Sequence, residues 1–174
     1  MTVRPFGPLG RLLFCVSKMS AVLGVLVFVA LVTMSIVSIL GRKLAATPVP
    51  GDMEILQMAA AFASTSFFAY CHLNGGDMKV DFFTARLSTS TQHRLDAIGS
   101  LLMGLLGWLL TWRSGAGCVS LYQSGETSMV LGWPVWVAYA LMLPGFFLLG
   151  LAGFYMAGVH WRCRLVVGQN KVLT

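Results

Sequence analysis

The hydrophobic residues of this chain fall into long runs that are separated by short polar segments. The first run contains no charged residue over positions 19–40, and the second contains none over positions 55–76. A helix of about 20 apolar residues, at about 1.5 Å per residue, crosses a hydrocarbon core roughly 30 Å thick. The pattern therefore predicts two membrane-spanning helices, at about 19–40 and 53–73.

The third apolar run is shorter and is bounded by charged residues. It covers residues 97–112, between Asp96 and Arg113. Side chains at the ends of a span can reach toward the headgroups, so the helix can continue past both residues. The segment TSTQ at 89–92 has the pattern of a capping box, which starts a helix. A third helix is predicted at about 92–114.

The fourth run lies between Glu126 and Arg162. Its membrane part is expected to begin near Pro134, because a proline in the first helical turn gives up no hydrogen bond. This predicts a fourth helix at about 134–158. The sequence as a whole predicts an all-α integral membrane protein, a single membrane domain over 1–174 with four transmembrane helices in two hairpins.

The segment YCHLNGGDMKVDFFTARLS, residues 70–88, connects the two hairpins. Its Asn-Gly-Gly sequence at 74–76 is a typical helix stop, because these residues tolerate a left-handed backbone. Beyond the stop, helical spacing separates an apolar face from a polar one, with Val80, Phe83 and Leu87 opposite Asp81, Thr84 and Ser88. The pattern predicts a short amphipathic helix at about 79–89 in the headgroup plane. A solvated loop is the plain alternative.

Composition supports the membrane assignment. The chain is 57% hydrophobic and 10% charged, whereas soluble domains carry roughly 25% charged residues. Four widely spaced cysteines form no C-x-x-C pair, which argues against a disulfide framework and favours small buried side chains.

The basic residues orient the chain. Nine fall on one side of the predicted topology: Arg4, Arg11, Lys18, Lys79, Arg86, Arg94, Arg162, Arg164 and Lys171. The other side has three: Arg42, Lys43 and Arg113. Lys and Arg are enriched on the cytoplasmic side of membrane proteins, so both termini are expected in the cytoplasm.

The predicted spans lack the chemistry of a self-sufficient carrier or an enzyme. Their interiors contain no Asp, Glu, Lys or Arg, whereas ion-coupled carriers keep ionisable groups there. This argues against a small exporter that works through a buried carboxylate. The sequence also contains no nucleophile motif, P-loop or dinucleotide fingerprint. No catalytic or substrate-binding residue is predicted, and the chain is not expected to be an enzyme.

Two histidines leave one alternative open. His72 and His160 lie near the cytoplasmic ends of their helices, beside Cys71 and Cys163. If the ends approach each other, they could ligate haem, as in a membrane anchor of a redox enzyme. Together with the two cysteines they could also form a Cys-His metal site, although the spacing is not a zinc signature. No metal or cofactor is predicted.

The outer connection between the first two helices, GRKLAATPVPGDMEIL, combines a basic pair with acids at a helix start. Asp52 and Glu54 there complement the positive end of the helix dipole. Glu54 could alternatively pair with Arg42 or with a partner chain. In the third helix, Ser100 and Gly104 form a small-xxx-small pair, which permits close packing within the chain or against another membrane protein.

In their order and spacing, these features resemble the small membrane subunit (DctQ-type) of tripartite ATP-independent periplasmic (TRAP) transporters, over roughly residues 18–160. The resemblance rests on Arg42 after helix one, PVPGDMEIL with Glu54, GGDMKVDFF after helix two, and GWPVWVAYALMLPGFFLL at the start of helix four. Asp77 stands where the family often has His.

The resemblance implies a scaffold of the bacterial inner membrane that binds no substrate itself. Its implied partners are a large multi-helix permease, which holds substrate and sodium ions, and a periplasmic binding protein that delivers an organic acid, commonly a carboxylate. Candidate interface or structural residues are Arg42, Glu54, Asp81, Phe82, Phe83, Leu87, Gly104, Pro134 and Trp136. By their side of the membrane, candidates for periplasmic docking are Lys43, Asp52, Arg113 and Glu126.

Overall fold

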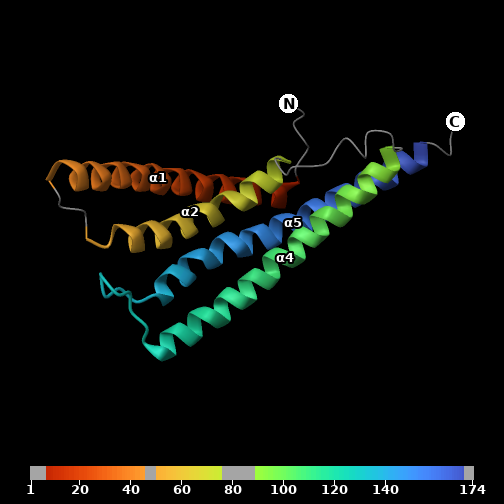
Figure 1. Cartoon of the computed structure of the whole chain (residues 1–174). Coiled ribbons are helices and arrows are strands. Elements are labelled where there is room, and N and C mark those ends of the chain that lie inside the picture. The colour runs from red at the N-terminus through yellow and green to blue at the C-terminus, as the bar shows by residue number, and fades with distance from the viewer. Residues whose placement is uncertain (1–6, 46–49, 76–88, 171–174) are drawn as a thin grey trace.

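The computed structural model describes residues 7–45, 50–75 and 89–170. Its helices are α1 (Pro8–Ala45), α2 (Asp52–Asn74), α4 (Thr89–Ser124) and α5 (Trp136–Asn170) (Figure 1). The described part of the chain is all-helical apart from an isolated bridge between Thr127 and Pro134. The interfacial helix expected at about 79–89 falls almost wholly outside the described residues.

Three of the helices extend well beyond the apolar runs that predicted them. α1 has 38 residues, α4 has 36 and α5 has 35. Arg113, expected near the end of the third helix, lies inside α4. A charge does not stop a helix, whereas Gly125 with φ 66° follows the last residue of α4 and ends it. α5 begins after Pro134, whose carbonyl accepts a hydrogen bond from the Val137 amide at 3.3 Å.

Four spans were expected, and three helices in the described part of the chain are long and apolar enough to cross a membrane: α1, α4 and α5. α2 has 23 residues, but it carries more polar side chains. Thr65 and Ser66 of α2 are buried. Each donates its hydroxyl hydrogen bond to the carbonyl of Phe62, both at 2.9 Å. These two side chains therefore face the protein interior, whereas Gln57 and Ser64 of the same helix are exposed.

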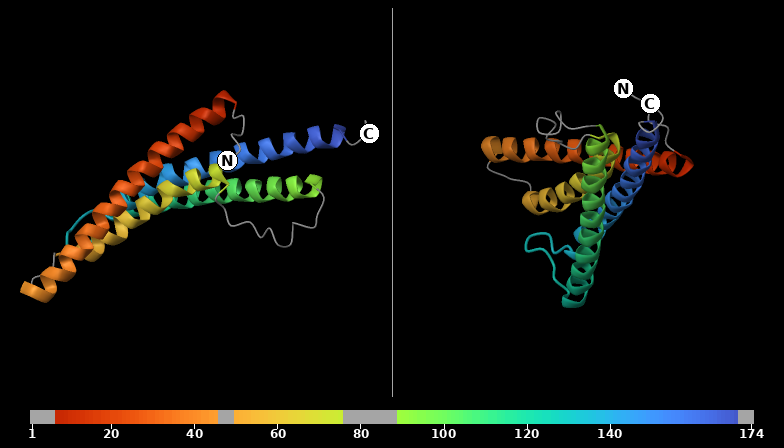
Figure 2. Two further views of the ribbon diagram at one scale, coloured as in Figure 1. Left: turned by 90° about the horizontal axis from the view of Figure 1, so that it is seen from above. Right: turned by 90° about the vertical axis from the view of Figure 1, so that its right-hand side faces the viewer.

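The helices form a row, not a closed bundle. α1 packs on α2, α2 on α5 and α5 on α4, with a minor contact between α1 and α5. The hairpin of α1 and α2 lies at an angle to the hairpin of α4 and α5, and the two meet along α2 and α5 (Figures 1 and 2). A row has two broad outer faces, which explains why Cys15 and Cys71 are exposed and not buried as expected.

Glycines bring α4 and α5 into backbone contact. A Cβ atom built on Gly153 would lie 2.4 Å from the Gly104 nitrogen, and one on Gly107 would lie 2.5 Å from the Gly150 nitrogen. Small residues permit this approach, which maximises van der Waals contact in a membrane. The small residues of α4 thus pack within this chain, and Gly104 has a structural role there.

α2 is joined to its neighbours by similar close contacts. A Cβ atom on Gly24 of α1 would lie 2.9 Å from the Ser66 Cβ, and one on Gly145 of α5 would lie 2.7 Å from the Thr65 Cβ. Near the C-terminal end of α2, a small apolar core joins α2, α5 and α1. It consists of Ala69, Leu73, Ala152 and Met156, with Leu13 and Phe14 packed against it.

Candidate functional site: an acidic clasp at the start of α2

The first turn of α2 presents two carboxylates. Gly51, with φ 76°, precedes the helix, and its carbonyl accepts hydrogen bonds from the amides of Glu54 and Ile55, each at 3.1 Å. Asp52 and Glu54 both lie in this turn. Negative charge is favourable at the positive end of the helix dipole. Each carboxylate also accepts hydrogen bonds from a segment outside α2.

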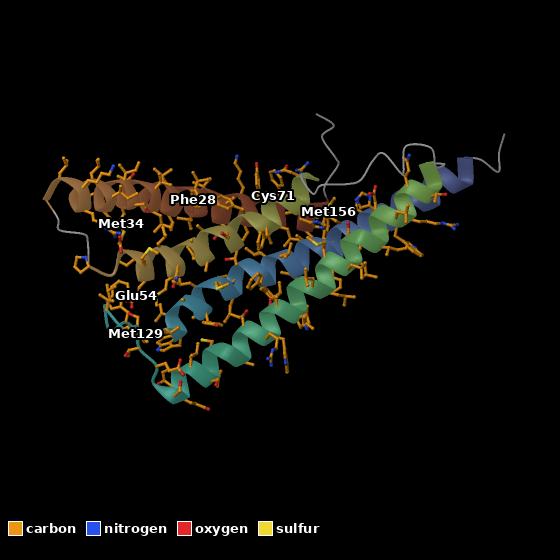
Figure 3. All side chains as sticks on the ribbon, in the orientation of Figure 1. Phe28, Met34, Glu54, Cys71, Met129 and Met156 are labelled. Atoms are coloured by element: carbon orange, nitrogen blue, oxygen red, sulfur yellow. The ribbon has the colours of Figure 1, made fainter. Side chains whose placement is uncertain are left out.

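Glu54 binds the loop between α4 and α5. Its Oε2 atom accepts hydrogen bonds from the Ser128 hydroxyl at 2.5 Å and the Leu131 amide at 3.0 Å, and its Oε1 atom accepts one from the Val130 amide at 2.9 Å. Figure 3 shows Glu54 beside Met129 of this loop. Bonds to an ionised acceptor are stronger than neutral ones. We call these four residues, Glu54, Ser128, Val130 and Leu131, the Glu54 clasp.

The loop is folded to fit this position. The Ser128 amide donates to the Trp133 carbonyl at 2.8 Å, and the Gly132 amide donates to the Ser128 carbonyl at 3.1 Å. Leu131 covers Gly51 so closely that a Cβ atom there would lie 1.8 Å from Leu131 Cδ1. The loop is therefore held by a charged hydrogen-bond acceptor, Glu54, and by the close packing of Leu131 on Gly51, where any larger residue would clash.

Asp52 faces the opposite way, toward α1. Its Oδ2 atom accepts hydrogen bonds from the Ser38 hydroxyl at 2.5 Å and from Arg42 Nη2 at 3.4 Å, and its Oδ1 atom accepts one from the Met53 amide at 2.8 Å. Arg42 is one of the two partners expected for Glu54, but in the structure it forms its ion pair with Asp52. Together the two acids attach α2 to α1 and to the α4–α5 loop.

Both carboxylates have lowered pKa values. The hydrogen bond from Ser128 is the main cause for Glu54, followed by bonds from the loop amides, and these outweigh the opposing effect of desolvation on the pKa. For Asp52 the pKa is lowered chiefly by the Ser38 hydroxyl, then by the Met53 amide and the charge of Arg42, again against desolvation. Both groups are ionised at neutral pH.

The remaining expected site residues are divided between the loop and the surface. Trp136 starts α5 and packs edge-on against Tyr122, with ring centroids 5.6 Å apart. Pro134 pairs with Thr127 in the isolated bridge. Lys43, Arg113 and Glu126 are exposed. Asp81, Phe82, Phe83 and Leu87 lie outside the described residues.

At the opposite end of the molecule, a histidine links α5 to α4. His160 Nδ1 lies 4.0 Å from Asp96 Oδ2, and the His160 side chain is buried. His72 of α2 is also buried. Among the described residues, no group of three or more His, Cys, Asp or Glu is placed to hold a metal ion.

The sequence singled out Glu54 but not its partners. Ser128, Val130 and Leu131 are 74 to 77 residues away along the chain. Two of the three donors are backbone amides, which carry no residue-specific signal. The turn residues around Gly132 indicate a loop, but they do not indicate where it binds.

Long apolar helices, packed through glycines and tied by polar contacts at their ends, define a multi-pass helical membrane protein. Residues 29–163 match the family described as "Tripartite ATP-independent periplasmic transporters, DctQ component". The match covers well over half of the chain, so the chain belongs to this family and is the small membrane subunit of a TRAP transporter, as the resemblance indicated. No curated protein and no solved structure matches the chain. Its family and its helices place it in the bacterial inner membrane.

Proposed function

We propose that this subunit is a non-catalytic scaffold for the large permease of a sodium-coupled, binding-protein-dependent transporter of organic acids. The observation that carries the proposal is the packing of α4 on α5. Their backbones touch where Gly104 and Gly107 meet Gly153 and Gly150. Such contacts leave no passage for a solute between these helices, which favours a supporting role.

Two threonine hydroxyls of the helices support the same division of labour. Thr33 donates to the Val29 carbonyl at 2.9 Å, and Thr111 donates to the Gly107 carbonyl at 2.7 Å. The single hydroxyl protons of Thr33 and Thr111 are thus used within their own helices and are not available as donors to a substrate. In our proposal, the large permease supplies those ligands.

The outer faces of the row fit a scaffold. α1 and α4 expose apolar side chains along their length, including Leu26, Val29, Leu102 and Leu109. Such surfaces are favourable only against lipid or against another membrane protein. We place both termini and the interfacial helix expected at about 79–89 on the cytoplasmic side, and the Glu54 clasp on the periplasmic side, where the binding protein docks.

Co-purification tests the proposal. The tagged chain, expressed with the products of its neighbouring genes and purified in mild detergent, should bring a larger multi-helix permease with it. Vesicles that contain this complex, supplied with the binding protein and a sodium gradient, should accumulate an organic acid. Vesicles with the chain alone should not.

Accumulation by the chain alone, or recovery of the chain and the permease as separate species, would contradict the proposal. The purified chain should also be colourless. A haem absorption band would instead support the alternative of a redox anchor that uses His72 and His160.

A further inference from the structure

An apolar groove of about 490 Å³ lies between α1, α2 and the start of α5. Its floor is one stripe of α2 with helical spacing: Ile55, Met58, Ala59 and Phe62. Its walls are Val27 on one side and Trp133, Pro134, Val137, Ala138 and Leu141 on the other. The volume lies within the range of about 300–1,000 Å³ that is typical of small-ligand sites.

The groove has the shape of a wedge. α1 and α5 come together beyond it, where Leu13 and Phe14 pack against the core that contains Ala152 and Met156. The floor spans about two helical turns, or about 10 Å, and a helix with its side chains is itself about 10 Å wide. A flexible hydrocarbon chain therefore fits better than a partner helix. Water has no polar partners in such a lining.

Cationic side chains lie beyond the Ile55 end of the groove floor. Asp52, one turn before Ile55, holds Arg42 by a single contact at 3.4 Å, and the Arg42 side chain is 62% exposed. Lys43 beside it is exposed as well. Guanidinium groups have five donors, so Arg42 keeps donors available for a phosphate. Trp133 lines the same end of the groove, and tryptophan favours the headgroup level.

We propose that this groove binds one acyl chain of an anionic phospholipid, whose phosphate is bound by Arg42 and Lys43. Charge complementarity selects this occupant, because the exposed Arg42 is bound to Asp52, one turn before the first floor residue of a wholly apolar slot, and exposed Lys43 follows Arg42 in the chain. The inference goes beyond the scaffold role and does not depend on which substrate the transporter carries.

Native mass spectrometry of the purified full chain tests the proposal, with phosphatidylglycerol and phosphatidylcholine as probes. The chain should retain one phosphatidylglycerol and should prefer it to phosphatidylcholine. Lys43→Gln should weaken phosphatidylglycerol binding about fivefold, since one cation near an anionic lipid contributes about that factor. Equal retention of the two lipids, or no effect of Lys43→Gln, would overturn the headgroup assignment.

Filling the groove tests the acyl-chain site. Ala59→Trp on the floor and Leu141→Trp on the wall should each remove the retained lipid, whereas Leu109→Trp, on the exposed face of α4, should keep it. The two filling variants lie on different helices, so a folding defect in one leaves the other as a test; elution as a monodisperse peak identifies the folded ones. Unchanged lipid retention in a folded filling variant, or a second protein chain in the groove, would overturn the proposal.

Discussion

Glu54 shows how one carboxylate can serve two structural needs. At the residue scale, its place in the first turn of α2 follows from the helix dipole, which the sequence alone indicates. Its three loop donors follow from tertiary structure. The same holds for Arg42, whose partner is Asp52 and not Glu54. Local sequence thus identifies charged helix starts, but the fold decides their partners.

Removing the charge of Glu54 should loosen the α4–α5 loop. In Glu54→Gln the acceptor becomes neutral and one of its oxygen atoms becomes an amide nitrogen, so the amides of Val130 and Leu131 lose strong bonds. Their hydrogen exchange should accelerate by about an order of magnitude. Glu126→Gln, which alters an exposed carboxylate in the same loop, is the matched control and should leave these rates unchanged.

The clasp should also weaken in acid. A lowered pKa means that the folded state favours the ionised form of Glu54, so this contribution to stability is complete above its ordinary pKa of 4.5 and is lost as the pH falls through the lowered value. Trp133 fluorescence, followed from pH 7 downward in a variant that lacks the other tryptophans, should report loop opening only below about pH 4.5. Opening in the neutral range would contradict this assignment.

At the scale of elements, the sequence predicted where helices lie better than where they end. Apolar runs located α1, α2, α4 and α5, because burial in lipid requires continuous apolar length. The helix ends depend on backbone geometry. The sequence predicted that the third helix ends near Arg113, whereas α4 continues to Ser124 and ends at Gly125. Gly104 was recognised as a packing residue, but its partners on α5 required the structure.

The α4–α5 seam gives a test with an internal control. Gly153→Ala places a methyl group 2.4 Å from the Gly104 nitrogen and should destabilise the protein by about 1–3 kcal/mol, the usual cost of overpacking. Gly158→Ala lies on the same helix with nothing within 4 Å, so it should stabilise by up to about 1 kcal/mol through helix propensity. Thermal unfolding in detergent measures both. Equal shifts would show that the backbone contact contributes little.

At the scale of the whole molecule, the row arrangement is the property least accessible from the sequence. Four apolar helices in two hairpins are compatible with a closed bundle, and periodicity does not distinguish the two. α2 packs on α5, through Gly145 against Thr65, as it would in either arrangement; the structure is a row because α1 and α4 do not pack against each other in the described part of the chain. An open row leaves most helices with a face toward lipid, which suits a subunit that supports a larger partner.

The row also limits how the two hairpins are joined. The hairpins share one principal line of contact, and two bodies joined along a line can rock about it. The Glu54 clasp is a second attachment at one end of that line, since it connects the first turn of α2 to the loop that leads into α5. Three hydrogen bonds to one carboxylate thereby add a polar attachment between two hairpins that otherwise meet through apolar and small residues.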